Sequence, residues 1–173
     1  MDNTKNNTKL NFDSTLKSLV KGGGSHVILC IGSDRVIGDC LGPLVGHMLT
    51  KDYNVGAYVY GSLSHPVTAL NLAQAVDYIK RRHTGAMIIA VDSSIGSEDE
   101  IGVIKVNKGG IYPGSAVGKS LPYVGDVSVT AIVSHRRAPA HALSSVRLGL
   151  VHSLAKQIAE SLNDALGQNT MSA

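Results

Sequence analysis

The chain has 173 residues, of which 43% are hydrophobic and 17% charged, and its formal net charge is +3. These values are typical of one ordinary globular domain and exclude a wholly disordered or coiled-coil chain. The small charge does not favour nucleic-acid binding, and no apolar run approaches the roughly 20 residues of a membrane span. Two cysteines do not make a secreted disulfide framework, so we expect a cytosolic protein. From its charge and its short apolar runs, we expect it to bind neither nucleic acid nor membranes.

The chain begins with a polar segment, residues 1–11, which predicts a disordered tail. Residues 12–20 have apolar side chains at helical spacing and precede a run of glycines, which predicts a helix that ends there. The apolar run over residues 26–31 then predicts a strand buried on both faces. We expect one domain over residues 12–167, followed by a flexible tail over residues 168–173.

Predicted helices and strands alternate through the rest of the chain. Apolar stripes at helical spacing predict helices over residues 41–53, 64–82 and about 139–166. Apolar or alternating runs predict further strands over residues 56–61, 86–91, 101–106 and 127–133. This alternation predicts an α/β protein, a three-layer α/β/α sandwich with a mostly parallel, twisted sheet.

Polar residues are concentrated where the predicted strands end. In open α/β sheets, functional sites form beyond the carboxyl ends of the strands. The segments expected to meet at that edge are Gly32–Asp39, Gly61–His65, Asp92–Gly96 and Ser134–Arg137. This concentration exceeds what simple connections between elements need, so we expect the functional site there.

Asp39 and Asp92 each follow an apolar run that predicts a buried strand. Each side chain has a structural alternative, because aspartate is a common cap of a following helix. Two carboxylates held close together cannot both ionise cheaply, so the pKa of one rises and the pair shares a proton. Such a pair can activate water and protonate a leaving amine, which favours amide hydrolysis.

The other polar residues of these segments are expected to support the pair. Asp34 and Arg35 either form an ion pair that stiffens the loop, which we favour, or leave Arg35 to orient a substrate carbonyl. Cys40 has no neighbouring base and is not expected to be a nucleophile. His135 follows a predicted strand, so Asp39, Asp92 and His135 are an alternative site for a divalent metal ion; otherwise we expect no cofactor.

Three segments resemble, in matching order, motifs of the bacterial spore germination protease. Asp39-Cys40-Leu41-Gly42-Pro43 is similar to its Asp-x-Leu-Gly-Pro segment, and residues 88–93 are similar to the strand that ends in its second aspartate. Residues 111–119 resemble its His-Pro-Gly-Ser-Gly-Val-Gly-Asn loop. The short chain and the motif Gly-Asp-Cys-Leu-Gly-Pro resemble those of the YyaC-type sporulation proteins, small relatives of that protease.

The resemblance implies the fold shared with hydrogenase maturation proteases, a twisted sheet between helices. It also implies an aspartate-dependent endopeptidase of sporulation or germination, located in the cytosol, the forespore or the spore core. Asp39 and Asp92 match the two required aspartates. In the hydrogenase maturation relatives the equivalent aspartates bind metal together with a histidine, for which His135 is the candidate.

The supporting residues come from the loop segments and the matching motifs, and the partners come from the resemblance. Residues expected to bind substrate or support the pair are Asp34, Arg35, Ser93, Gly114 and Ser115. The expected partner is a protein or peptide substrate, spore proteins included, and a homo-oligomer remains open. A non-enzymatic sporulation binding protein on the same fold is the remaining alternative.

The chain departs from the protease motif at three positions. Tyr112 replaces the histidine of the loop, Ala116 replaces a glycine and Lys119 replaces an asparagine. These differences leave the substrate and any activation step open, and they do not touch the two aspartates.

Overall fold

The computed structural model describes residues 2–22, 24–114, 121–136 and 142–167, with side chains described from Leu10 onward. The helices are α1 (Asp2–Val20), α2 (Leu41–Lys51), α3 (Leu72–Arg82) and α4 (Leu148–Leu166). The strands are β1 (His26–Cys30), β2 (Tyr58–Tyr60), β3 (Met87–Gly96), β4 (Ile104–Lys108) and β5 (Val127–His135). Short 3₁₀ helices lie at η1 (Ile37–Asp39), η2 (Glu98–Glu100) and η4 (Ala142–Ser145).

The strands form one five-stranded sheet in the order β2-β1-β3-β5-β4. β2, β1, β3 and β5 are parallel, and β4 pairs antiparallel with β5 at one edge. The central strand β1 and the first half of β3 (residues 87–91) are almost entirely apolar, as expected for strands covered on both faces. The predicted α/β class and the mostly parallel sheet are confirmed.

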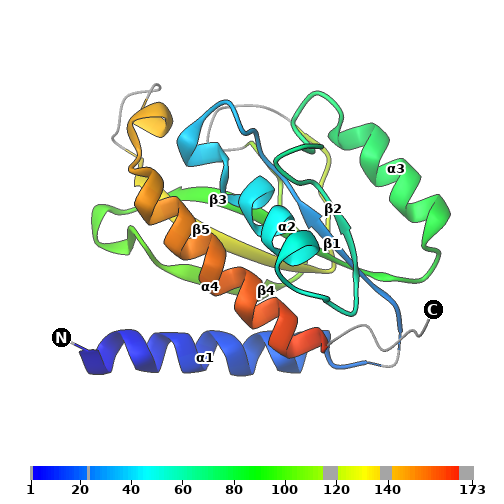
Figure 1. Cartoon of the computed structure of the whole chain (residues 1–173), viewed down its shortest axis with the longest axis horizontal. Coiled ribbons are helices and arrows are strands. Elements are labelled where there is room, and N and C mark those ends of the chain that lie inside the picture. Colours follow the sequence, from blue (N-terminus) through cyan, green and yellow to red (C-terminus); the bar gives the residue numbers. More distant parts are fainter. Residues whose placement is uncertain (1, 23, 115–120, 137–141, 168–173) are drawn as a thin grey trace.

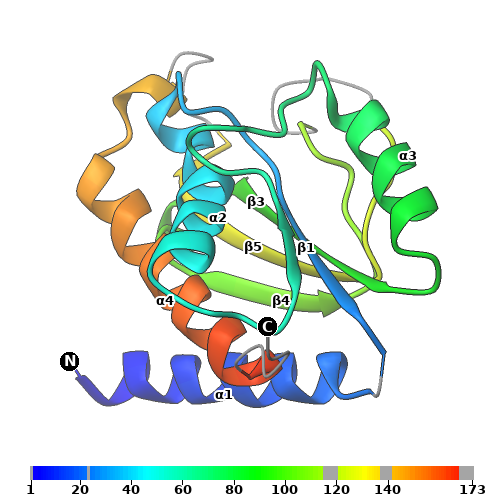
Figure 2. The same ribbon diagram turned by 45° about the vertical axis from the view of Figure 1, so that its right-hand side comes forward.

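Helices cover both faces of the sheet (Figure 1). α1, α2 and α4 pack on one face, where Leu16, Val45 and Ile158 are fully buried. α3 packs on the other face, where Ile79 belongs to the same buried cluster as Leu29 of β1. Figure 2 shows α3 and α2 on opposite sides of the strands. Each large apolar side chain buried in this way contributes about 1.5–3 kcal/mol.

Helix α1 begins earlier than the sequence indicates. Residues 2–11 are helical, although their composition predicts a disordered tail. The C-terminal half of α1 is anchored on the core through Phe12 and Leu16, and Asp13 Oδ1 accepts a hydrogen bond from Ser161 Oγ of α4 at 2.5 Å. Once packing has fixed one end of a helix, the unfavourable nucleation step is already complete. Each further residue then adds one hydrogen bond, so residues of weak helical propensity can continue the helix. The predicted tail over residues 168–173 lies outside the described residues.

Helix α3 begins later than the sequence indicates. The apolar stripe predicts a helix from Ser64, but residues 61–71 form a loop. Within this loop the Thr68 amide donates to Asn71 Oδ1 at 2.7 Å, and Asn71 Nδ2 donates to the Pro66 carbonyl at 3.1 Å. Asn and Thr side chains that bond the local backbone in this way compete with helix formation.

Helix α4 also begins later than expected, at Leu148 after η4, and residues 139–141 of the predicted helix lie outside the described residues. Among the helices that the structure describes, none has both the length and the apolar character that a membrane crossing requires.

Strands β3 and β5 run further than their apolar runs. β3 continues from Val91 to Gly96, and β5 continues to His135. Ser93 and Ser94 stay in the ladder opposite Ala131 and Ile132. A strand is held by backbone pairing, so polar side chains do not end it while a partner strand remains alongside. Asp92 therefore lies inside β3 and not at its end.

Candidate active site

The end of β1 joins the two segments that carry Asp39 and Asp92. The Ile31 amide donates to the Val91 carbonyl at 2.8 Å, directly before Asp92 on β3. Two residues later, the Ser33 amide donates to the Asp39 carbonyl at 3.0 Å. A three-residue stretch of backbone is therefore bonded to both aspartate-bearing segments, which fixes their relative position.

Glycines make this close approach feasible. Gly32 has φ 141°, and a Cβ there would lie 2.1 Å from the Asp39 carbonyl oxygen. A Cβ on Gly42 would lie 2.1 Å from the Ile31 carbonyl oxygen. Any side chain at either position would push apart the end of β1, the turn of Asp39 and the first turn of α2. The glycines of the Ile31–Pro43 stretch thus serve the packing that places Asp39.

Asp39 ends the 3₁₀ helix η1 and is partly exposed. Its amide donates to the Val36 carbonyl at 2.9 Å, which closes the turn. The structural alternative was a helix cap, but the N-cap residue of α2 is Cys40, whose side chain makes no capping hydrogen bond. Asp39 therefore does not occupy the N-cap position of α2.

Asp92 is a buried carboxyl group, with 7% of the residue exposed. Side chains alternate along β3, so Asp92 shares the α3 face of the sheet with Ala90. The Ser93 amide donates to Asp92 Oδ1 at 2.8 Å. Asp92 caps no helix, because it lies within a strand.

The two carboxyl groups interact electrostatically. Burial raises the pKa of Asp92 well above its ordinary value, and the negative charge of Asp39 raises this pKa further. The hydrogen bond from the Ser93 amide opposes this rise by favouring the ionised form. The structure therefore brings Asp39 and Asp92 together as a pair with unequal environments, one partly exposed and the other buried.

His135 does not join this pair. It lies at the end of β5 opposite Gly96, whereas Asp92 pairs with Thr130. Four residues of strand separate Gly96 from Asp92, which corresponds to about 13 Å. Within the described part of the chain, no group of three His, Cys, Asp or Glu side chains is arranged to hold a metal ion. The donors suggested for the alternative metal site thus do not converge, and we derive no step through a metal.

The predicted ion pair between Asp34 and Arg35 does not form. Ion pairs given by the described residues are Arg81–Asp77 and Lys105–Glu100. Asp34 and Arg35 are both exposed at a turn, where the Arg35 amide donates to Ser33 Oγ at 3.2 Å. The loop is held instead by hydrogen bonds of its backbone amides, those of Ser33 and Arg35 included.

Cys40 is buried beside the pair and does not resemble a nucleophile. Burial raises the pKa of its thiol, and the charges of Asp34 and Asp39 raise it further. A cysteine nucleophile needs the opposite environment, one that stabilises the thiolate.

The remaining expected site residues are placed differently. Ser93 contributes its backbone amide to Asp92, as described above. Gly114 occupies a turn with φ 70° at the end of the described part of its loop. Ser115 and Arg137 lie outside the described residues. Of the segments expected to form loops, Asp92–Gly96 belongs to β3, and Ser134 and His135 belong to β5.

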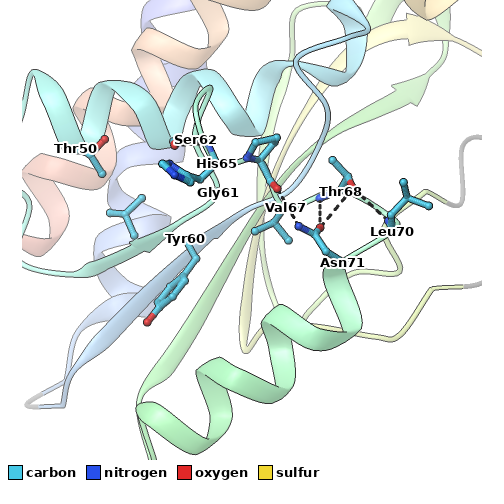
Figure 3. Close-up of a pocket in the computed structure, with 11 residues that line it drawn as sticks. Thr50, Tyr60, Gly61, Ser62, His65, Val67, Thr68, Leu70 and Asn71 are labelled. Atoms are coloured by element: carbon cyan, nitrogen blue, oxygen red, sulfur yellow. Dashed lines mark hydrogen bonds between the residues drawn. The ribbon is translucent and has the colours of Figure 1, made fainter.

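A pocket of about 760 Å³ opens at the carboxyl end of β2 (Figure 3). Asp39 and Asp92 are not among the described residues that line it. The pocket is connected to the segment before Asp39 through Gly32, whose amide donates to the carbonyl of the lining residue Val67 at 2.9 Å. The sequence indicated Gly61–His65 at this edge but missed Val67 and Asn71, because both fell inside a predicted helix. The Pro66 and Asn71 turn signals could have indicated the loop.

Comparison with known proteins relates the chain to a sequence family and to a solved fold. The protein named "Uncharacterized protein YyaC" of Bacillus subtilis (strain 168) is 38% identical over 148 residues, which cover 84% of this chain and 72% of that protein. The crystal structure of the [NiFe] hydrogenase maturation protease HycI from Thermococcus kodakarensis KOD1 matches with a TM-score of 0.51 at 18% identity. The match covers 86% of this chain and 99% of that chain.

The HycI match shows that the folds are alike, as the resemblance implied. The family model described as "Protein of unknown function (DUF1256)" matches residues 1–161. The chain is also similar to YyaC over most of its length. Because the family model spans most of the sequence, the chain belongs to the DUF1256 family.

Proposed function

We propose that the protein is an aspartate-dependent endopeptidase that acts on proteins of sporulation or germination. The observation that carries the proposal is the buried carboxyl group of Asp92, whose pKa is raised by burial and by the charge of Asp39. A buried carboxyl next to a second carboxylate costs stability; Asp92 lies inside a strand and so caps no helix, and the ion pairs of the described residues do not include it. Strongly perturbed acids of this kind are typical of catalytic sites.

The unequal environments assign the two roles. Asp92 is the member of the pair that holds the shared proton, because burial disfavours its ionised form and raises its pKa. Asp39 is more exposed and carries the negative charge. Asp39 takes a proton from a water molecule that attacks the scissile carbonyl, and Asp92 gives its proton to the leaving amine. The pair thereby supplies both the general base and the general acid of amide hydrolysis.

The start of α2 supports the developing negative charge. This helix begins at Leu41, two residues after Asp39, and its N-cap residue Cys40 makes no side-chain capping hydrogen bond. The helix dipole and the first-turn amides favour an anion there, so they can polarise the carbonyl under attack.

The substrate class comes from the similarity of three segments to the spore germination protease motifs. HycI is a maturation protease by name, and its likeness to this chain concerns the fold. A peptide or protein substrate agrees with that name, and a spore protein is the specific choice tested below.

The test is hydrolysis of spore-coat and spore-core protein extracts, and of a proteome-derived peptide library, by wild type, Asp39→Asn and Asp92→Asn. We expect each substitution to lower turnover by about 10²-fold or more, because each removes one proton-transfer group. Cleavage positions are identified by mass spectrometry.

The matched control is Asp77→Asn, which makes the same chemical change on the surface of α3, where Asp77 pairs with Arg81. It should cleave like wild type. Equal activity of wild type and both site variants would exclude the carboxylate pair as the catalyst. An intact partner complex with no turnover of any substrate would instead favour a binding protein on the same fold.

A further inference from the structure

The pocket at the carboxyl end of β2 has the size of a ligand site. Its volume of about 760 Å³ lies within the roughly 300–1,000 Å³ typical of such sites. One wall is Thr50 of α2, another is the end of β2, and the third is the loop over residues 61–71. Figure 3 shows Thr50 and Asn71 on different elements around this space.

The pocket is tied to the segment that positions Asp39. Val67 lines the pocket, and it forms an isolated parallel bridge with Ile31. Its carbonyl accepts a hydrogen bond from the Gly32 amide at 2.9 Å. The next amide, that of Ser33, bonds to the Asp39 carbonyl. A ligand in the pocket would therefore contact a loop whose backbone is hydrogen-bonded to the segment that holds Asp39 in place.

The pocket walls are preformed. Asn71 Oδ1 accepts from the Thr68 amide and Asn71 Nδ2 donates to the Pro66 carbonyl, as Figure 3 marks with dashed lines. Ser62 and His65 close a turn, since the His65 amide donates to Ser62 Oγ at 3.2 Å and the Ser62 amide donates to the His65 carbonyl at 3.1 Å. A wall held by its own hydrogen bonds loses little entropy when a ligand binds.

The chemistry of the lining favours an uncharged ligand. Among the described lining residues there is no Asp, Glu, Lys or Arg. The apolar contribution comes from Val59, Pro66 and Val67, and from Leu70, which is 94% exposed. A large apolar side chain left this exposed beside a pocket is a natural contact for an aliphatic group.

The adjoining strand favours a peptide as the ligand. β2 is one of the two edge strands of the sheet, and among the described strands it pairs with β1 alone. The outer backbone of an edge strand can pair with an added extended segment, while neighbouring pockets select its side chains. β2 supplies Val59 and Tyr60 to the pocket, so an extended peptide can use the edge and the pocket together.

We propose that this pocket is the substrate subsite that receives an uncharged, aliphatic part of an extended peptide. The proposal rests on the peptidase function proposed above and specifies its substrate. The loop over residues 61–71 and Thr50 thereby set specificity, whereas Asp39 and Asp92 perform the chemistry.

The first variant fills the pocket without touching the core. Thr50 is exposed, and its hydroxyl donates to the Gly46 carbonyl of its own helix at 2.9 Å. Thr50→Trp projects a large ring into the pocket, and Lys51→Trp is the matched control on the adjacent exposed position, which does not line the pocket. The second variant, Leu70→Asp, places a charge at the pocket, and its control is Leu148→Asp at the exposed start of α4.

The probes are mixtures of acetylated, amidated hexapeptides. One mixture contains Ala, Val, Leu and Ser, and the others carry Asp or Lys at the two central positions. Binding is measured on the full chain, and on Asp92→Asn to prevent turnover, by ligand-observed NMR and by hydrogen exchange of residues 61–71. We expect the aliphatic mixture to bind at least about tenfold tighter than the charged mixtures, and Thr50→Trp and Leu70→Asp to weaken it about tenfold.

The outcomes separate this proposal from the peptidase function. Binding weakened by Thr50→Trp and Leu70→Asp but not by their controls, without turnover by wild type, supports the subsite and contradicts the peptidase. Turnover that depends on Asp92 while both pocket variants bind and cleave like wild type overturns the subsite alone. A preference for charged peptides, or absence of protection over residues 61–71, also overturns it.

Discussion

The carboxylate of Asp39 raises the pKa of the buried Asp92 carboxyl, although the two residues come from different elements of the fold. Their proximity depends on Ile31 and Ser33, whose amides bond to the two segments. Such an arrangement is unfavourable for stability, because a buried acid next to a negative charge resists ionisation. The fold therefore maintains at this place a cost that a neutral side chain would avoid.

Asp92→Asn should stabilise the protein at neutral pH. In the unfolded chain Asp92 ionises at its ordinary pKa, whereas in the folded state its pKa is raised. Between these two values the folded state binds more protons, so the free energy of unfolding falls as the pH rises. Asparagine stays neutral at every pH and avoids this loss. We expect a higher Tm at pH 7, by about 2–4 °C for each kcal/mol gained.

The gain should disappear below about pH 4, where the carboxyl is protonated in both states. Thermal unfolding at pH 3, 5 and 7 measures this dependence. A variant that is less stable than wild type at pH 7 but not at pH 3 would mean that the ionised carboxylate stabilises the fold, and the assigned environment of Asp92 would be wrong.

Asp39→Asn should lower the pKa of Asp92 without restoring its ordinary value. The substitution removes the charge of Asp39 but leaves burial, which is the larger cause of the rise. The measurement is a ¹³C-carboxyl NMR titration of the aspartates. Asp34→Asn is the matched control: the charge of Asp34 acts on Cys40 and is not among the causes that shift Asp92. An Asp92 titration that is identical in wild type and Asp39→Asn would show that the carboxyl groups do not interact.

Activity should survive chelation. The proposed chemistry uses two carboxylates and water, and the described part of the chain brings no third metal-binding side chain to them. EDTA is added in large excess over trace metal, at about 5 mM. We expect turnover to remain within about twofold of the untreated rate, whereas loss of a required metal would raise the barrier by several kcal/mol. Loss of turnover that added Zn²⁺, Ni²⁺ or Mn²⁺ restores would favour a metal-dependent protease.

The apolar runs were sufficient to predict the sheet and the region of the site. Residues 26–31 and 86–91 are continuous apolar segments, and only a central parallel sheet buries both of their faces. That placement predicted that the segments following them would meet, and Asp39 and Asp92 do interact. The catalytic role of the pair stays a prediction.

What the sequence did not predict depends on partners far along the chain. Asp92 stays within a strand because β5 continues beside it, which a local pattern cannot show. The same extension carries His135 away from the pair. The late start of α3 follows from the hydrogen bonds of Asn71, which compete with an otherwise convincing apolar stripe.

Gly32→Ala should destabilise the protein by about 2–4 kcal/mol, the sum of backbone strain and overpacking. Gly32 has φ 141°, and the added Cβ would lie 2.1 Å from the Asp39 carbonyl oxygen. The matched control is Gly24→Ala, whose Cβ would meet nothing within 4 Å. Urea unfolding measures both. Equal stability of the two variants would show that the turn of Asp39 is not packed against Gly32 as described.

Glu100→Gln tests the turn that follows β3. Glu100 accepts hydrogen bonds from Lys105 Nζ at 2.6 Å and from the Ser97 amide and hydroxyl at 2.8 Å each. The bond from Lys105 is the largest cause that lowers the pKa of Glu100 to about 2, followed by the bonds from Ser97. A lowered pKa stabilises the folded state above the ordinary value of 4.5, and this contribution is lost as the pH falls toward about 2.

Glu100→Gln should therefore be less stable than wild type at pH 7, and the difference should vanish near pH 2. Urea unfolding at pH 2, 4 and 7 measures it. Glu98→Gln is the matched control, since Glu98 lies in the same 3₁₀ helix and makes none of these hydrogen bonds. The turn lies beyond Gly96, the end of β3, and so is four or more residues away from Asp92. We therefore expect Glu100→Gln to leave the environment of Asp92 unchanged. A difference in stability that is the same at pH 2 and pH 7 would show that Glu100 acts through packing and not through its charge.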